Sequence, residues 1–433
     1  MGKGGNRNAN SELTEYTWDE IRGHTSLVDR WLVIDGLVYD ITNWSKKHPG
    51  GAKVMGHFAG QDATEAWAAL HNDKELVAKY MKPLLVGKVK EPGNVSEIEE
   101  DMRSLRKAAE DMGLFKVNPW FYVAHFFSII ACEVIGYLII ANYGTSWTAF
   151  LAASFFLLIS QGQAGWTQHD YGHLSVFNSR KLNHLMHEVV IGGIKAASSH
   201  WWNFRHFQHH VKPNVYVKDP DITLPYVFLL GDKMPSWWGE KKKGFMPYQF
   251  QHHYFFLFGP PALLPVYFHI ENLYFLFKRK EWWDLFWMLT FFTRWFHLYG
   301  PYLGGWGTLG LYFFVRFLES HWFVWVTQMN HIPMDIDKDQ QRDWFSQQLA
   351  AACNVEPGYF NDWFTGHLNY QIEHHLFPTM PRHNYHKVAP LVKSMCKKHQ
   401  IPYLSKPLLT AFGDIVRSLK KSGNIWHEAY YDM

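Results

Sequence analysis

Residues 206–210 are His-Phe-Gln-His-His, a cluster of three imidazoles within five positions. Two similar clusters stand at residues 169–173, which are His-Asp-Tyr-Gly-His, and at residues 371–375, which are Gln-Ile-Glu-His-His. On a helix, side chains three or four positions apart lie on one face. Imidazole nitrogen binds redox-capable first-row metals, and three such faces supply more nitrogens than one ion accepts. The clusters therefore predict two metal ions.

The composition around these clusters is typical of a membrane protein. Of the 433 residues, 47% are hydrophobic and 18% are aromatic, which fits belts of aromatic side chains at membrane interfaces. The net charge of +3 is too small for a nucleic-acid-binding surface, so we expect no nucleic-acid partner. The three cysteines are scattered along the chain and indicate no disulfide framework.

Four stretches are apolar and long enough to cross a hydrocarbon layer of about 30 Å. They are residues 120–141, 147–164, 254–277 and 307–327. A fifth apolar stretch, residues 282–299, carries charged residues, and a fifth crossing would separate the third His cluster from the first two. We therefore predict that residues 282–299 lie along the membrane interface or are partly re-entrant, on the lumenal side. Lysine and arginine are dense on the side that holds the clusters, which assigns that side and both chain termini to the cytosol.

Residues 15–90 have the pattern of a separate soluble module. Thr17-Trp-Asp-Glu20 is a helix capping box, and residues 30–40 predict a β-hairpin that turns at Asp35-Gly36. His48 stands in a His-Pro-Gly-Gly turn, and His71 follows a helical stretch. Two imidazoles from separate segments can hold a heme iron from both sides, which suits electron transfer. The alternative is that His48 caps a turn and His71 lies on the surface.

The predicted fold is a small α+β module followed by an all-α membrane domain with four transmembrane helices and a cytosolic helical cap. The module at residues 15–90 is preceded by a disordered tail, residues 1–14. A polar linker and an amphipathic helix occupy residues 91–118, and the membrane domain covers residues 119–433.

Single histidines outside the clusters differ in their position relative to the predicted spans. His331 directly follows the last predicted span, level with the three clusters, and is a further candidate ligand. His184, His187 and His367 are weaker candidates, which we expect outside the set of ligands. Asp170 and Glu373 lie inside the clusters but point away from the ligand face, where carboxylates orient imidazole N–H groups.

The metal chemistry follows from the ligands. Removal of hydrogen from an unactivated methylene needs a metal–oxygen oxidant, which favours iron with O₂ over zinc, since zinc has no redox chemistry. Such a reaction consumes two electrons delivered singly, and a fused heme module would supply them. The same oxidant could instead add oxygen to the methylene, so a hydroxylase is one alternative to hydrogen removal. A nonenzymatic heme or metal-binding membrane protein is another. A transporter is disfavoured because the clusters lie at the ends of the spans and not within them.

The module at residues 15–90 resembles cytochrome b5. The resemblance lies in His48-Pro-Gly-Gly51, in Trp31-Leu-Val-Ile34 before it and in Gly60-Gln-Asp-Ala63 after it. It implies a heme b with His48 and His71 as the axial ligands.

The clusters, their order and the fused module together resemble the front-end fatty acyl desaturases, over nearly the whole chain. Further similar stretches are Trp201-Trp202, Lys212–Asn214, Lys218–Asp221, Phe317–His331 and Leu376–Arg382. The opening Met-Gly-Lys-Gly-Gly and the closing Ser418–Gly423 favour the branch that introduces a Δ6 cis double bond, with Δ5 or dual activity as the alternative.

The resemblance implies two non-heme iron ions, O₂ as co-substrate and a polyunsaturated acyl-CoA as substrate. It also implies a multi-pass position in the lipid bilayer of the endoplasmic reticulum, with NADH-cytochrome b5 reductase as the electron source. Carried onto this sequence, the metal ligands are His169, His173, His206, His209, His210, His374 and His375. Gln371 belongs to the third cluster of the family as a catalytic candidate, and desaturases outside the front-end group have His at this position. Similarity to the stearoyl-type enzymes adds His331 as a ligand and puts Thr327 where those enzymes have an Asn that holds a ligated water.

Overall fold

The computed structural model describes residues 13–431, apart from residues 92, 94, 145, 224 and 225. The chain divides into two units, Met1–Glu97 and Ile98–Met433. Of the predicted disordered tail, residues 1–14, residues 1–12 lie outside the described part of the chain.

The first unit is built on a five-stranded sheet with the strand order β1-β5-β4-β3-β2. Strands β1 and β5 pair in parallel, and the other neighbours are antiparallel. The elements of this unit are β1 (Glu15–Tyr16), α1 (Trp18–Gly23), β2 (Thr25–Ser26), β3 (Asp29–Ile34), β4 (Leu37–Asp40), η1 (Ser45–Lys47), α2 (Ala52–Gly56), α3 (Thr64–Leu70), α4 (Lys74–Met81), η2 (Lys82–Leu84) and β5 (Leu85–Val89).

Two local predictions for this unit are confirmed. The side chain of Thr17 accepts from the backbone N–H of Glu20, and the carboxylate of Glu20 accepts from the backbone N–H of Thr17, which completes the capping box. Asp35 and Gly36 have φ values of 50° and 72°, as the two central residues of a type I′ turn require. The hairpin β3–β4 therefore turns where the sequence places it.

The sheet of the first unit separates two apolar clusters. Leu32 and Ile34 belong to one cluster, and Val33 between them belongs to the other, because successive side chains of a strand point to opposite faces. The cluster around Leu32 also contains Phe58 and Trp67, from the segment that precedes His71.

The second unit is almost entirely helical. Its elements are α5 (Glu97–Asp111), α6 (Pro119–Tyr143), α7 (Trp147–Gly172), α8 (Arg180–His187), the π-helix η3 (Glu188–Ile194), α9 (Ser199–Val211), α10 (Lys233–Glu240), η4 (Tyr248–Phe250), α11 (Gln251–Phe258), the π-helix η5 (Leu263–Phe268), α12 (His269–Arg279), α13 (Trp282–Gln328), α14 (Trp344–Ala351), β6 (Asn354–Val355), α15 (Tyr359–Thr365), α16 (Gln371–Leu376), η6 (Arg382–Asn384), α17 (Tyr385–Lys398), β7 (Ser405–Lys406) and α18 (Leu408–Tyr431).

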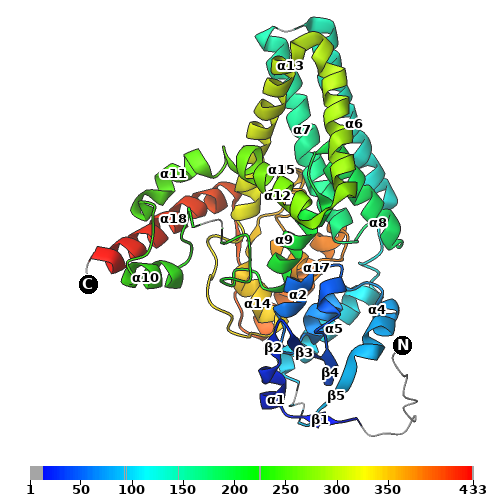
Figure 1. The fold of residues 1–433 in the computed structure, drawn as a ribbon, viewed down its shortest axis with the longest axis vertical. Coiled ribbons are helices and arrows are strands. Elements are labelled where there is room, and N and C mark those ends of the chain that lie inside the picture. Colours follow the sequence, from blue (N-terminus) through cyan, green and yellow to red (C-terminus); the bar gives the residue numbers. More distant parts are fainter. Residues whose placement is uncertain (1–12, 92, 94, 145, 224–225, 432–433) are drawn as a thin grey trace. The chain divides into compact units, whose positions relative to one another are not determined.

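Helix α13 consists of two antiparallel halves. Gly304, with φ 65° and ψ 177°, interrupts the helix and reverses the chain. The indole N–H of Trp295 in the first half donates to the carbonyl of Thr308 in the second, and Trp295 and Tyr312 lie 6.0 Å apart between ring centroids. Both halves pack against α6 and α7, and Figure 1 shows α6, α7 and α13 standing together at one end of the unit.

The prediction of a span over residues 254–277 is wrong. Helix α11 ends at Phe258, Gly259-Pro260-Pro261 follows, and a separate helix then begins at Leu263, in which η5 runs directly into α12. Proline cannot donate a backbone hydrogen bond and fixes φ, so it prevents a straight helix through this stretch.

The prediction for residues 282–299 is also wrong, because this stretch forms the first half of α13. Its charged residues have partners inside the protein. Asp284 accepts from Ser199 and His200, and Arg294 pairs with Glu133 at 2.9 Å. Paired in this way, the charges are compatible with a long, largely apolar helix.

Among the described residues, α6 is the one helix that is both long and apolar enough to cross a membrane, which alone is weak evidence. Large apolar side chains are nevertheless exposed on all the long helices of the bundle. Examples are Phe127 and Leu138 on α6, Phe155 on α7, and Leu289 and Trp306 on α13. Exposed apolar surface of this extent indicates contact with lipid or another apolar partner.

The chain leaves regular helical structure at the end of η3, before α9 begins. Arg294, Gln161 and Arg316 donate to the backbone carbonyls of residues 193–195 in turn. A buried carbonyl without a partner would cost about 1–3 kcal/mol, so these bonds fix the segment. Ser198 then caps α9 through the N–H of Trp201, and α9 carries the second histidine cluster.

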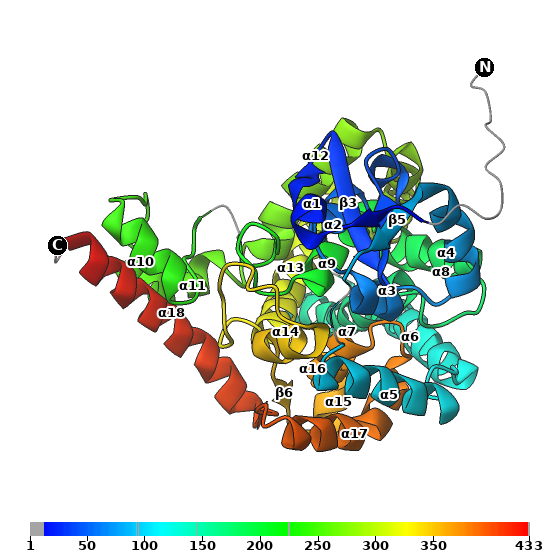
Figure 2. The ribbon, with the colours of Figure 1, turned by 90° about the horizontal axis from the view of Figure 1, so that it is seen from below.

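Helices α10 and α11 and the C-terminal helix α18 pack side by side. Figure 2 shows α18 running past α10 and α11. Trp426 of α18 donates to the carbonyl of Lys243, and Ser422 donates to the carbonyl of Gly231.

Candidate heme and metal sites

His48 and His71 face each other in the first unit. Their ring centroids lie 6.0 Å apart, and the ring planes are inclined by 70°. Because imidazole nitrogens bind metal ions at about 2 Å, this separation fits one ion between the two rings.

Local contacts prepare both rings for a metal. Nδ1–H of His71 donates to the carbonyl of Trp67 at 2.9 Å, which leaves Nε2 as the unprotonated nitrogen. Gly50 lies so close to His48 that a Cβ there would come within 3.1 Å of the ring, which explains a glycine at this position. Burial and the neighbouring His71 lower the pKa of His48 to about 4, so this ring is neutral, as a metal ligand must be.

The three histidine clusters and His331 come together in the second unit. His169 lies in the last turn of α7, and His173 follows that helix directly. The second cluster lies on α9, the third on α16, and His331 follows the end of α13. Of the predicted site residues here, His206 is half-buried, and those that are buried are His169, His173, His209, His210, His331, Gln371, His374 and His375.

The larger group contains five imidazoles, whose ligand atoms all lie within 4.8 Å of one another: His169, His173, His206, His210 and His374. Nε2 of His206 lies 3.1 Å from Nε2 of His169, 2.9 Å from that of His173 and 3.0 Å from that of His210. Nε2 of His374 is buried and has no hydrogen-bond partner in the part of the chain that the structure describes. Converging neutral nitrogens of this kind fit a metal ion.

The smaller group contains His209, His331 and His375. Nε2 of His209 lies 3.3 Å from Nε2 of His375, and the side-chain nitrogen of Gln371 lies 2.9 Å from Nε2 of His331. The two groups are neighbours, since the ring centroids of His210 and His375 are 4.4 Å apart. The arrangement can therefore hold two metal ions side by side.

Hydrogen bonds on the far side of the rings set their orientation. Nδ1–H of His209 donates to Asp219 at 2.9 Å, and Nδ1–H of His375 donates to Oε1 of Gln348 at 2.9 Å. Nδ1–H of His331 donates to the carbonyl of Ala351 at 2.8 Å. In each ring Nε2 is then the unprotonated nitrogen, and it points toward the group.

Burial controls the charge of the clusters. Burial, with neighbouring imidazoles as the further cause, lowers the pKa well below its ordinary value for His173, His206, His210, His374 and His375. Burial also lowers the pKa of His331, to about 3. His209 differs: burial acts to lower its pKa, but the carboxylate of Asp219 raises it. Most of the rings are therefore neutral at physiological pH and able to bind metal.

The weaker candidates take other places. His184 is exposed on α8, and His187 hydrogen-bonds to Gln168 at 2.8 Å. His367 is half-buried, with its ring centroid 5.6 Å from that of Phe121. The hydroxyl of Thr327 donates to the carbonyl of Phe323 at 3.0 Å.

The two carboxylates inside the clusters differ in their contacts. Asp170 lies 3.6 Å from Nδ1 of His169, too far for a hydrogen bond. Glu373 accepts from Asn354 and Tyr403, at 2.7 and 2.8 Å, and its hydrogen bonds here involve no imidazole of the clusters.

Sequence reasoning missed three residues that contact Nδ1 of the cluster histidines. Asp219 accepts from His209, Gln348 accepts from His375, and the hydroxyl of Tyr385 contacts His374. Asp219 stands ten positions after His209, within the Lys218–Asp221 stretch, so its place in the sequence offered a signal. Gln348 and Tyr385 lie in stretches without a distinctive pattern, and only the fold brings them to the site.

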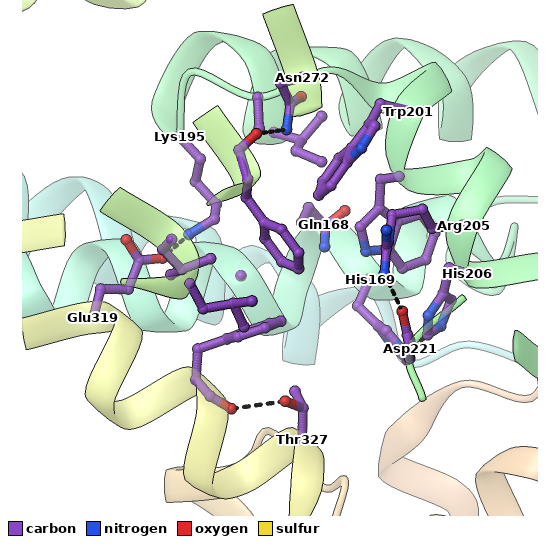
Figure 3. A pocket seen from close by; sticks show the side chains of 18 of the residues that line it. Gln168, His169, Lys195, Trp201, Arg205, His206, Asp221, Asn272, Glu319 and Thr327 are labelled. Atoms are coloured by element: carbon purple, nitrogen blue, oxygen red, sulfur yellow. Dashed lines mark hydrogen bonds and ion pairs between the residues drawn. The ribbon is translucent and has the colours of Figure 1, made fainter. Parts of the chain in front are cut away.

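A cavity of about 240 Å³ lies beside the histidines. His169, His206, His209, His331 and Gln371 line one part of it, and Lys195 and Glu319, which form an ion pair, line another. Figure 3 shows Lys195 and Glu319 on one side of the cavity and His169 and His206 on the other. Apolar side chains complete much of the wall, among them Leu263, Phe268, Met288, Phe292 and Phe323.

Comparison with known proteins gives two family matches. The fatty acid desaturase family matches residues 145–407, and the cytochrome b5-like heme/steroid binding domain family matches residues 17–90. Over 426 residues the chain is 50% identical to the fatty acid desaturase 2-like protein FADS2B of Mus musculus, which covers 97% of this chain and 88% of that protein.

Two solved structures are similar to the N-terminal part. Cytochrome b5 of Ostreococcus tauri virus 2 is 37% identical, covering 17% of this chain and 95% of that one, with a TM-score of 0.17. Cytochrome b558 of Ectothiorhodospira vacuolata is 34% identical, covering 18% of this chain and 98% of that one, also with a TM-score of 0.17.

A cytochrome b5 domain fused to a buried imidazole cluster beside an apolar cavity defines an O₂-dependent oxidoreductase. The chain belongs to the fatty acid desaturases, and among them to the front-end desaturases with an N-terminal cytochrome b5 domain.

Proposed function

We propose that the protein holds two non-heme iron ions and uses them to introduce a cis double bond into a fatty acyl chain. The ligands are His169, His173, His206, His210 and His374 for one ion and His209, His331 and His375 for the other. The observation that carries this proposal is the pair of imidazole groups, five beside three, at the wall of one cavity. With O₂, iron supplies the oxidising power that removes hydrogen from an unactivated methylene.

The residues of the chain prepare the site for this chemistry. Asp219 and Gln348 hold His209 and His375 in the tautomer that presents Nε2. Gln371 stands beside His331 as a further catalytic residue. Apolar residues such as Phe268 and Phe323 in the cavity wall exclude water from the acyl chain, which protects a reactive centre from side reactions.

The substrate is a polyunsaturated acyl-CoA, and the favoured position of the new double bond is Δ6. Support comes from the cavity that the histidines help to line and from the likeness of the two chain ends to the acyl-CoA 6-desaturase. A cavity that holds the acyl chain in one position fixes the distance between the head of the substrate and the metal centre, so it selects one bond for oxidation.

The N-terminal unit holds heme b between His48 and His71 and passes electrons one at a time. The 6.0 Å between the ring centroids and the neutral state of His48 support this assignment. NADH-cytochrome b5 reductase is the proposed source of the electrons. The proposed domains are the heme domain at residues 15–90, a linker and helix at residues 91–118, and the desaturase domain at residues 119–433.

The protein is proposed to lie in the endoplasmic reticulum membrane with four crossings: α6, α7 and the two halves of α13. The exposed apolar side chains of these helices support the proposal. The histidines, the N-terminus and the C-terminus then face the cytosol.

Δ5 or dual Δ5/Δ6 activity is the alternative, followed by hydroxylation with the same oxidant. Product analysis separates these functions. Cells that express the chain are fed labelled 18- and 20-carbon polyunsaturated acids, and the new double bond is located by mass spectrometry. A double bond at Δ6 supports the proposal. A product bond at Δ5, or oxygen added to the chain without a double bond, contradicts it.

A further inference from the structure

A group of buried polar atoms with few hydrogen bonds lies behind the larger metal group. Tyr122 and Asp170 interact with each other through their side chains, and neither the hydroxyl of Tyr122 nor Oδ2 of Asp170 has a further partner within the described residues. In the same part of the chain, Nδ1 of His367 and the three guanidinium nitrogens of Arg382 lack a well-aligned hydrogen bond. Tyr122, Asp170 and Arg382 expose only 3%, 3% and 1% of their surface. These residues come from α6, α7, the segment after α15 and η6, so the fold and not the local sequence brings them together.

These side chains face one another. Nε of Arg382 lies 3.2 Å from Oδ2 of Asp170, a charge pair without the alignment of a hydrogen bond. The guanidinium of Arg382 lies 5.4 Å from the centre of the Phe121 ring. The rings of His125, His367 and His383 approach the same Phe121 ring, at 4.2, 5.6 and 5.2 Å between centroids.

Such a set of atoms is typical of a site for buried water. An unsatisfied buried polar group costs about 1–3 kcal/mol, and native proteins leave few of them. A buried water usually makes about three hydrogen bonds to groups of this kind. A carboxylate that accepts, a guanidinium that donates and a hydroxyl that does both provide what a short chain of water molecules needs.

The backbone at His367 supports a functional role for this group. His367 has φ 65° and follows Gly366, which has φ 61°. Non-glycine residues are uncommon in the left-handed region, although His enters it more readily than most, and such conformations recur at functional sites. Gly366 is fixed by packing, because a Cβ there would come within 2.4 Å of the Trp166 side chain.

The group lies between the protein surface and the metal centre. His125, His367 and His383 are half-buried and reach the surface, whereas Asp170 adjoins His169 at 3.6 Å. On the same side, Tyr385 contacts Nδ1 of His374 at 2.9 Å.

The polar group is separate from the acyl cavity. None of Tyr122, Asp170, His367 and Arg382 lines the described cavity. Water behind His169 would therefore not wet the path of the acyl chain.

We propose that Tyr122, Asp170, Arg382 and His367 bind a chain of water molecules that conducts protons from the cytosolic surface to the metal centre. The inference rests on the proposed desaturase function. In that reaction one O₂ takes two electrons from the heme domain, two protons from solvent and two hydrogens from the substrate. It leaves as two water molecules, while the substrate gains a double bond. The protons have to come from water, and the water-binding group gives them a route that avoids the acyl cavity.

The test compares two matched tyrosine variants of the full-length protein, each supplied with heme, iron, reductase and NADH. Tyr122→Phe removes one hydroxyl of the water-binding group. Tyr299→Phe is the control. The hydroxyl of Tyr299 is also buried and has no partner among the described residues, but it lies in the apolar cluster of Trp295 and Tyr312, away from the water-binding group. The measurements are kcat, KM, the ratio of NADH consumed to double bonds formed, hydrogen peroxide release and the solvent isotope effect on kcat.

For Tyr122→Phe we expect kcat to fall on the order of a hundredfold, the lower end of the usual cost of a lost proton-transfer group, with KM and iron content unchanged. NADH consumption per double bond, peroxide release and the solvent isotope effect should all rise. Tyr299→Phe should match the wild type in all five measurements. His367→Asn, which tolerates the left-handed backbone, should act in the same direction as Tyr122→Phe.

Wild-type coupling and an unchanged solvent isotope effect in Tyr122→Phe would overturn the proton route. Loss of iron from that variant would overturn it as well, because the role would then be structural. The proposed function itself is tested by His375→Ala, which removes a proposed iron ligand. If the proposed function were wrong, this variant would keep both its iron and its turnover.

Discussion

The side-chain amide of Gln371 donates to Nε2 of His331 over 2.9 Å, while Nδ1–H of His331 donates to the carbonyl of Ala351. Oε1 of Gln371 is buried and has no hydrogen-bond partner in the described part of the chain. A half-turn of the amide would present this oxygen where the nitrogen now lies. The pair therefore offers the smaller imidazole group one nitrogen ligand and one adaptable oxygen.

From this pair we expect His331→Ala to reduce the iron content from about two ions to about one per protein and to abolish desaturation, since it removes one of three nitrogens. Gln371→Ala should keep more iron than His331→Ala but lose turnover. Metal analysis of the purified protein by mass spectrometry measures the iron. His184→Ala, on an exposed histidine of α8, is the control. Two irons in His331→Ala would remove this residue from the ligand set.

Asp219→Asn tests the support of His209. The amide keeps the volume of the carboxylate but lacks its charge. The ring of His209 should therefore be held less firmly, and its Nε2 should be less basic. We expect the metal affinity of the smaller group to fall about 10- to 100-fold, as is usual for partners of ligating histidines. Competition with a chelator measures the affinity. Asp232→Asn, on an exposed ion pair with Lys421, should leave it unchanged; equal affinities in the two variants would contradict the role of Asp219.

Gly172→Ala tests the packing of the first cluster. A Cβ on Gly172 would come within 2.2 Å of the Trp202 ring, and that ring lies 4.2 Å from His206 between centroids. We expect a loss of about 1–3 kcal/mol in stability, as overpacking usually costs, together with weaker iron binding. Gly300→Ala on α13 is the matched control, since nothing lies within 4 Å of its added Cβ. Thermal unfolding in detergent compares the two variants, and equal midpoints would show that Trp202 can move aside.

The start of α9 should show a pH dependence. The hydrogen bond to Asp284 raises the pKa of His200 above its ordinary value, so His200 is protonated over a wider range in the folded state. Its contribution to stability is then fully present below about pH 6.5 and is lost as the pH rises through the raised pKa.

His200→Gln should therefore lower the midpoint of thermal unfolding more at low pH than at high pH, relative to the wild type. His386→Gln, on an exposed histidine of α17, serves as the control. A stability difference that does not change with pH would contradict the protonated pair.

His48→Ala should abolish the heme absorption spectrum and NADH-driven desaturation, because one of the two proposed axial ligands is lost. The iron content of the histidine clusters should not change, since those ligands lie in the other unit. His24→Ala, in the same unit, is the control. Heme binding that survives in His48→Ala would contradict the axial assignment.

The sequence predicted features that depend on short-range patterns. The capping box at Thr17 and the turn at Asp35-Gly36 are set by neighbouring residues, and both are confirmed. The spacing of the histidines within each cluster put their side chains on one face, and the structure brings these faces together.

The failures come from long-range contacts. The interfacial prediction for residues 282–299 rests on their charges and on the need to keep the three histidine clusters on one side. Arg294 is satisfied by Glu133, far away in the sequence, and the loss of the span at residues 254–277 keeps the clusters together when residues 282–299 form a helix of the bundle. Residues 254–277 were apolar enough for a span, yet Pro260 and Pro261 break the helix. Gln348 and Tyr385 reach the metal groups only through tertiary packing, so no local pattern could identify them.

The reversal of α13 at Gly304 and the short connection between Tyr143 and Trp147 leave almost no chain at the far end of the bundle. In the proposed topology the lumen meets little more than two tight bends. Sugar attachment, proteolytic nicking and binding of lumenal chaperones would have hardly any polypeptide to act on. An epitope inserted after Gly304 would be the simplest lumenal reporter. Signals for degradation and surfaces for partner binding would have to lie on the cytosolic side.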